Sequence, residues 1–128
     1  MNTLSETHVA TLNGLYDKIA KTWNAGDRSY YLEVHQNCTF MAPNAEALTS
    51  REDIQAFVDA FPPGTAQFTV DQISGNTGLA VVQGKYAVDN PDGSVLDQGK
   101  FIGVYEMTAS GEFEMTHAIW NTSLPQVF

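Results

Sequence analysis

Apolar residues recur every three or four positions along the first part of the chain. They follow residues 3–6, whose sequence Thr-Leu-Ser-Glu is typical of the capping box that begins a helix. The spacing predicts one long amphipathic helix with an apolar stripe made of Val9, Leu12, Tyr16, Ile19 and Trp23. Gly26 suits the left-handed position that ends this helix, and Asp27 is a good N-cap for the next one.

Two shorter helices are predicted before residue 65. The second helix is expected to end near His35, and a short strand at residues 38–41 follows it. Residues 50–53 (Ser-Arg-Glu-Asp) are a second capping sequence. The third helix then carries apolar residues at helical spacing, namely Ile54, Phe57, Val58 and Phe61. Pro62 and Pro63 end it, because proline cannot continue the helical hydrogen bonding.

From residue 65 onward the period of the pattern falls to about two. Four strands are predicted, at residues 67–73, 79–88, 100–107 and 113–122. Turns rich in glycine and asparagine separate them and indicate hairpins, so the sheet should be largely antiparallel. Neither face of these strands is cleanly polar, whereas a sheet with one solvated face alternates apolar and polar residues. We therefore expect the helices to cover one face and a second copy to cover the other, in a homodimer.

Composition narrows the range of functions. The chain has 128 residues, 43% of them apolar, which fits a single domain over residues 1–128. Six Lys and Arg residues against 15 Asp and Glu give a net charge of −9, which disfavours nucleic acid and anionic membrane surfaces as partners. Cys38 is the single cysteine, so neither an intrachain disulfide nor a zinc site of Cys and His is expected. With no visible leader sequence and no apolar run of membrane-spanning length, a cytoplasmic location is expected.

Four short segments resemble sequences of the nuclear-transport-factor-2-like (NTF2-like) superfamily. They are residues 23–27 (WNAGD), 50–54 (SREDI), 99–102 (GKFI) and 119–123 (IWNTS), and they span nearly the whole chain. The last two resemble the SnoaL-like and DUF4440-like branches, whose fold is related to ketosteroid isomerase. The resemblance implies an α+β cone, in which three N-terminal helices pack on a curved, largely antiparallel mixed sheet. It also implies a cavity for a small apolar molecule, with no cofactor.

The resemblance to the ketosteroid isomerases does not extend to their catalytic groups. Those relatives use a carboxylate after the first strand as a base and a phenol on the first helix. The matching segments place these positions near Ala42 and Ile19, which carry neither group. On the last strand, Ala118 stands where the resembling branch often has aspartate. The sequence therefore predicts that this isomerase mechanism is absent.

Two histidines are the candidate catalytic residues. Histidine changes charge near neutral pH and can move a proton in a cavity. The structural alternatives are that His35 only ends a helix and that His117 lies at a subunit interface, on the strand face opposite Trp120. The residues expected to line the ligand pocket are Tyr16, Ile19, Trp23, Tyr31, Phe40, Phe57, Phe61, Tyr86, Lys100 and Trp120. Packing in the core is the alternative for the aromatic residues, and pairing with Asp97 or water is the alternative for Lys100.

Three functions are compatible with this pattern. The first is a cofactor-independent enzyme of isomerase, cyclase or dehydratase type that moves protons on a small apolar carbonyl compound. The second is a protein that binds a small apolar ligand without transforming it, and the third is a dimeric association module. Ligand affinity that changes with a midpoint near pH 6.5 would favour the enzyme, because it would place a titrating histidine at the ligand.

Overall fold

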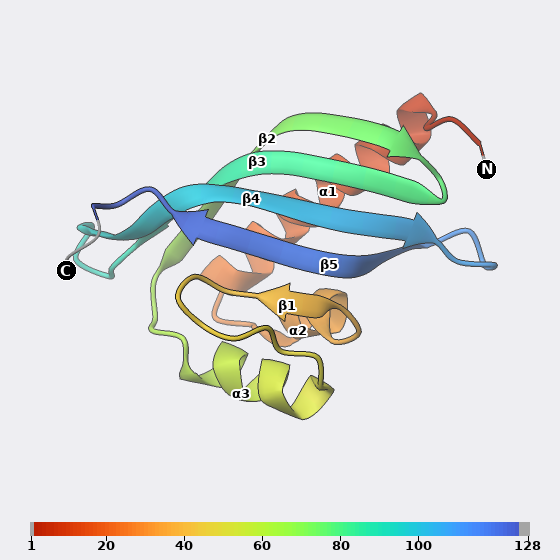
Figure 1. Ribbon diagram of the computed structural model, residues 1–128. Helices are drawn as coiled ribbons and strands as arrows, with labels where there is room; N and C mark the ends of the chain where they lie inside the picture. The colour runs from red at the N-terminus through yellow and green to blue at the C-terminus, as the bar shows by residue number, and fades with distance from the viewer. Residues whose placement is uncertain (1, 126–128) are drawn as a thin grey trace.

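The computed structural model describes residues 2–125 and has α+β architecture (Figure 1). The helices are α1 (Glu6–Asn24), α2 (Ser29–His35) and α3 (Arg51–Ala60), and the strands are β1 (Thr39–Met41), β2 (Thr65–Asn76), β3 (Leu79–Asp89), β4 (Val95–Met107) and β5 (Phe113–Thr122). The strands form one sheet in the order β1-β5-β4-β3-β2. Strand β1 runs parallel to β5 and the other pairs are antiparallel, so the predicted mixed sheet is confirmed. None of the helices within residues 2–125 has the length and apolar character needed to cross a membrane.

Helix α1 lies along one face of the long strands (Figure 1). Helices α2 and α3 lie near β1, which is the edge strand on the opposite side of the sheet from β2. The predicted apolar stripe of α1 is confirmed at Leu12, Tyr16, Ile19 and Trp23, which are all buried. The C-terminal end of α1 is tied to β2 through the Asn24 side chain. Its amide oxygen accepts from the Ala66 N–H at 2.7 Å, and its amide nitrogen donates to the Ala66 carbonyl at 2.9 Å. These contacts fix the helix over the sheet.

The helix starts agree in part with the sequence. Ser50 caps α3 as predicted, since its hydroxyl accepts from the Asp53 N–H at 3.1 Å. The predicted capping box at residues 3–6 is wrong by two residues. Ser5 is the N-cap of α1, and the His8 imidazole takes the place expected for a glutamate by accepting from the Ser5 N–H at 3.0 Å. An imidazole nitrogen that lacks a proton satisfies this orphan donor as a carboxylate does.

Strands β2 and β4 are longer than predicted. The turn between β2 and β3 contains only Thr77 and Gly78, so Gly75 and Asn76 belong to the strand. The Asn76 side chain holds this tight turn by accepting from the N–H groups of Gly78 and Leu79 at 2.9 and 3.1 Å. Sequence pattern alone favoured a longer loop because glycine and asparagine are typical of loops.

Glycines on the inner face of the sheet leave room for aromatic rings. A Cβ atom at Gly84 would lie 2.8 Å from the Phe101 ring, and one at Gly103 would overlap the Tyr16 hydroxyl. Tyr16 and Tyr105 meet at this place, with their hydroxyl oxygens 2.6 Å apart. The pair links α1 to β4 inside the core, where a hydroxyl without a partner is costly.

We expect Tyr105→Phe to lower the free energy of unfolding by about 1–3 kcal/mol, because the buried Tyr16 hydroxyl loses its protein partner. The double variant Tyr16→Phe/Tyr105→Phe should cost less than the two single changes added together, since it leaves no unpaired hydroxyl. Urea unfolding of the three variants and the wild type measures this coupling. Strict additivity would contradict the role given to the hydroxyl pair.

Candidate functional site

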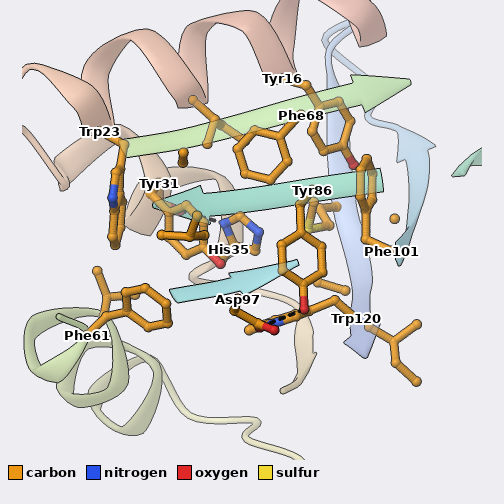
Figure 2. Close-up of a pocket in the computed structure, with 18 of the residues that line it drawn as sticks. Tyr16, Trp23, Tyr31, His35, Phe61, Phe68, Tyr86, Asp97, Phe101 and Trp120 are labelled. Carbon is orange, nitrogen blue, oxygen red and sulfur yellow. Dashed lines mark hydrogen bonds between the residues drawn. The ribbon is translucent and has the colours of Figure 1, made fainter. Parts of the chain in front are cut away.

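A cavity lies between the inner face of the sheet and the three helices. Its volume is about 90 Å³. A dry cavity of about 150 Å³ in another protein accepts benzene. The cavity here is smaller but partly open to the surface, so its upper limit is an organic molecule of about one ring. Nine aromatic side chains line it, namely Tyr16, Trp23, Tyr31, Phe57, Phe61, Phe68, Tyr86, Phe101 and Trp120. Figure 2 shows Trp23 and Phe61 on one side, Phe101 and Trp120 on the other, and His35 between them.

Local sequence explains which side chains reach the cavity. On α1, the spacing of Tyr16, Ile19 and Trp23 places them on one helix face. On β4, alternate residues point inward, so Asp97 shares the face of Phe101. Strands β3 and β5 supply Tyr86 and Trp120 by the same alternation, and α2 supplies its last residue, His35.

His35 is buried, with 5% of its surface exposed, and has one fixed hydrogen bond. Its Nδ1 lies 2.7 Å from the Tyr31 carbonyl oxygen. Because a carbonyl only accepts, Nδ1 carries the hydrogen and Nε2 keeps an unshared lone pair. Within residues 2–125 no protein group bonds to Nε2, yet no fully buried side-chain nitrogen or oxygen lacks a partner. Nε2 therefore retains access to the cavity that His35 lines.

Packing keeps this imidazole neutral. The Tyr31 ring stacks on it at 4.0 Å between ring centroids and 18° between planes, and the Phe40 ring meets it edge-on at 5.6 Å. Burial lowers the pKa of His35 to about 4, against a smaller opposite effect of its hydrogen bond to the Tyr31 carbonyl. At neutral pH the residue is thus a hydrogen-bond acceptor facing apolar space.

Asp97 and Tyr86 form a second polar group in the wall. The Tyr86 hydroxyl donates to Asp97 Oδ2 at 2.8 Å, while Asp97 Oδ1 accepts from the Thr122 hydroxyl at 2.7 Å and from the Gln98 N–H at 2.9 Å. Burial, followed by the hydrogen bond to Asp97 and its charge, raises the pKa of Tyr86. Tyr86 stays protonated, and its proton is committed to Asp97.

Solved structures with the same arrangement of helices and strands identify the fold. A cystatin-like-fold protein of unknown function from Nostoc punctiforme has a TM-score of 0.81 at 13% identity, over 96% of this chain and 98% of that chain. A ketosteroid isomerase-like protein from Erwinia carotovora atroseptica has a TM-score of 0.76 at 11% identity, over 94% and 100%. An NTF2-like protein with a cystatin-like fold from Novosphingobium aromaticivorans has a TM-score of 0.75 at 10% identity, over 95% and 92%. The chain has the NTF2-like fold.

The superfamily resemblance is thus confirmed at the level of the NTF2-like fold, and the SnoaL-like or DUF4440-like branch stays a prediction. No protein-family model matches the sequence, and no curated protein matches it. The chemistry of the cavity must therefore be argued from its own residues.

Most of the predicted pocket residues do line the cavity of this NTF2-like fold. They are Tyr16, Ile19, Trp23, Tyr31, Phe57, Phe61, Tyr86 and Trp120, and the candidate catalytic residue His35 lies among them. Ala118 shares the face of Trp120, as expected from strand alternation, and also lines the cavity. Whether these residues bind a ligand stays a prediction.

Three predicted site residues lie elsewhere. Phe40 is fully buried behind the wall, with ring contacts to Phe57 and Trp120 at 5.2 and 5.0 Å between centroids. Lys100 is exposed on the outer face because its neighbours on β4 face inward, and its Nζ lies 3.4 Å from the Ser123 hydroxyl. His117 is also exposed on the outer face, where its Nδ1 lies 2.9 Å from the Thr116 hydroxyl.

One acid–base group of the cavity wall, Asp97, was not predicted from the sequence as a site residue. The sequence suggested Asp97 only as a partner for Lys100. Asp97 lies two residues before Gly99 and four before Phe101, so strand alternation places all three on the same face of the sheet. Tyr16, three residues before Ile19 on α1, lies in the cavity wall as predicted. Its hydroxyl is shared with Tyr105, and burial raises its pKa. Within the described residues, no three His, Cys, Asp or Glu side chains gather in a way that could hold a metal ion.

The neutral His35 predicts that acid destabilises the fold before most carboxylates titrate. In the unfolded chain His35 binds a proton below about pH 6.5, whereas in the folded protein it does so only below about pH 4. The contribution of the neutral His35 to the free energy of unfolding is therefore fully present above pH 6.5 and is lost as the pH falls from 6.5 to 4. From neutral pH to about pH 4.5 the loss should reach about 2–3 kcal/mol. Urea unfolding at the two pH values measures it.

A matched pair of variants isolates the histidine. His35→Gln should remove most of the acid-dependent loss because glutamine does not titrate, whereas His117→Gln should leave the loss unchanged because that imidazole is exposed. An equal acid-dependent loss in wild type and His35→Gln would show that His35 is not the buried neutral base described above.

Proposed function

We propose that this protein binds a small, mainly apolar molecule with one polar group inside the cavity. The observation that carries the proposal is the His35 Nε2 lone pair, which reaches an aromatic cavity without a partner in the protein. Nε2 is not fully buried, so a molecule in the cavity can reach this free acceptor. A ligand can donate a hydrogen bond to Nε2 while its apolar body contacts the aromatic walls.

Proton-transfer catalysis is the second candidate function. It is supported by the same Nε2, which is unprotonated at neutral pH and able to accept a proton. A general base is most effective when its pKa lies near the working pH, and a pKa of about 4 makes His35 a weak base. The lowered pKa of His35 therefore favours binding over isomerase, cyclase or dehydratase chemistry.

Filling the cavity tests the binding proposal. Ala118→Leu adds side-chain volume at the cavity wall, and Ala87→Leu adds the same volume to β3 outside the cavity. With benzyl alcohol as the probe, calorimetric titration should show that Ala118→Leu weakens binding by about tenfold or more, while Ala87→Leu binds like the wild type. Equal affinity in all three proteins would place the probe outside the cavity and contradict the proposal.

We propose further that the outer face of the sheet packs against a second copy of the chain. Its centre holds Ile102 and Ile119, which are directly paired between β4 and β5. Both border the cavity, yet their surfaces are 39% and 44% exposed. Val104 adjoins them on β4. An apolar group of this kind on a sheet face is typical of an interface.

Ile119→Lys should convert a dimer into a monomer, because it places a charge at the centre of the proposed interface. Ala56→Lys, on the exposed surface of α3, should leave the dimer intact. Sedimentation velocity at micromolar concentration gives the masses. A monomeric wild-type protein would refute the dimer without affecting the cavity.

A further inference from the structure

The cavity wall contains a negative charge that no nearby cation balances. Asp97 is the only Asp, Glu, Lys or Arg side chain among the lining residues of the described chain. Its carboxylate makes no ion pair within residues 2–125 and relies on three neutral hydrogen-bond donors. Lys85 and Lys100 lie on the outer face of the sheet, and Lys85 pairs with Asp71 there at 3.4 Å.

Arg28 also leaves this charge unbalanced, although it lies near the cavity. Its guanidinium donates to the Val58, Phe61 and Pro62 carbonyls at 2.7, 2.6 and 3.2 Å. It lies 4.4 Å from the centre of the Trp23 ring, where cation and π face attract. The guanidinium is therefore engaged outside the cavity, and it shows that one wall residue already accommodates a cation on an aromatic face.

The fixed polar atoms of the wall present lone pairs to a ligand. The Tyr86 proton is directed at Asp97, which leaves the phenolic oxygen as an acceptor. His35 Nε2 is an acceptor because Nδ1 holds the hydrogen. The Tyr31 hydroxyl, which has no protein partner within the described residues, can donate or accept. A ligand with several N–H or O–H donors satisfies this set better than a carbonyl compound does.

The aromatic walls add a preference for positive charge. The face of an aromatic ring is electron-rich, and a cation within about 6 Å of it gains about 0.5–2 kcal/mol of attraction, more where water is excluded. An anion would be repelled by the same electron-rich ring faces and by the Asp97 carboxylate. The net charge of −9 on the chain acts in the same direction.

We propose that the ligand is a small organic ammonium ion, with its cationic nitrogen between Asp97 and the aromatic walls and a hydrophobic body of about one ring in the cavity. This inference rests on the proposed binding function and replaces the carbonyl compound expected from the sequence. The ammonium N–H groups meet the lone pairs of the wall, and its charge balances the unpaired carboxylate.

A panel of four probes with the same ring tests the ligand class on the wild-type protein. Calorimetry with benzylammonium, benzyl alcohol, benzaldehyde and benzoate should rank benzylammonium first by about tenfold over the neutral probes, with benzoate undetected. If benzyl alcohol or benzaldehyde binds as tightly as benzylammonium, the ammonium inference fails while the binding function stands. If no probe binds, the binding function fails too.

Substitution of Asp97 distinguishes attraction of the cation by the cavity carboxylate from attraction by the net charge of the protein. Asp97→Asn keeps the side-chain size and should weaken benzylammonium binding by about tenfold while changing benzyl alcohol binding little. Asp59→Asn removes the same charge from the exposed surface of α3 and should leave both affinities unchanged. Equal effects of the two variants would show that the net charge of the protein, rather than the cavity, selects the cation. The wild-type panel decides the ligand class even if Asp97→Asn does not fold.

Discussion

The close approach of aromatic rings to the inner face of the sheet is the constraint on which the cavity depends. Gly84, Gly99 and Gly103 lie on the adjacent strands β3 and β4 and leave that face without side chains at three places. A Cβ at Gly99 would lie 2.9 Å from the Tyr86 hydroxyl, which donates to Asp97, and one at Gly103 would overlap the hydroxyl of Tyr16. The glycines therefore allow the large residues to pack inward while a cavity remains between them.

The same burial that builds the cavity sets the protonation of its polar residues. The Tyr31 ring stacks on His35 and the Tyr31 carbonyl fixes its tautomer. Burial at this position makes the charged form of His35 unfavourable. Three hydrogen-bond donors hold the Asp97 side chain in the wall. A neutral acceptor and an anchored negative charge, surrounded by aromatic rings, define which ligands the fold can hold. The site and the stability of the fold are therefore linked, because acid lowers the free energy of unfolding by protonating His35, the residue that faces the ligand.

Sequence periodicity predicted the elements well and the depth of individual residues less well. The spacing on α1 places Tyr16, Ile19 and Trp23 on one buried face, and glycine- and asparagine-containing turns mark the hairpins. Periodicity does not say which inward residue touches a cavity, so Phe40 proved to be core behind the wall. It also does not show which polar residue finds donors: Asp97 reaches Tyr86 and Thr122 only after β3, β4 and β5 pair. Tyr86 and Thr122 lie 11 and 25 residues from Asp97 in the sequence, so periodicity within one strand does not indicate these contacts.

The proposed function requires His35 to be a neutral base whose Nε2 faces a space that a ligand can enter. Nitrogen-15 NMR of the histidine side chains tests it most directly, because the shifts of Nδ1 and Nε2 report which one carries the hydrogen. At about pH 6 we expect an uncharged ring protonated at Nδ1, with an Nε2 signal that moves when benzyl alcohol or benzylammonium is added. A ring that titrates near pH 6.5, or an Nε2 signal that neither ligand moves, would contradict it.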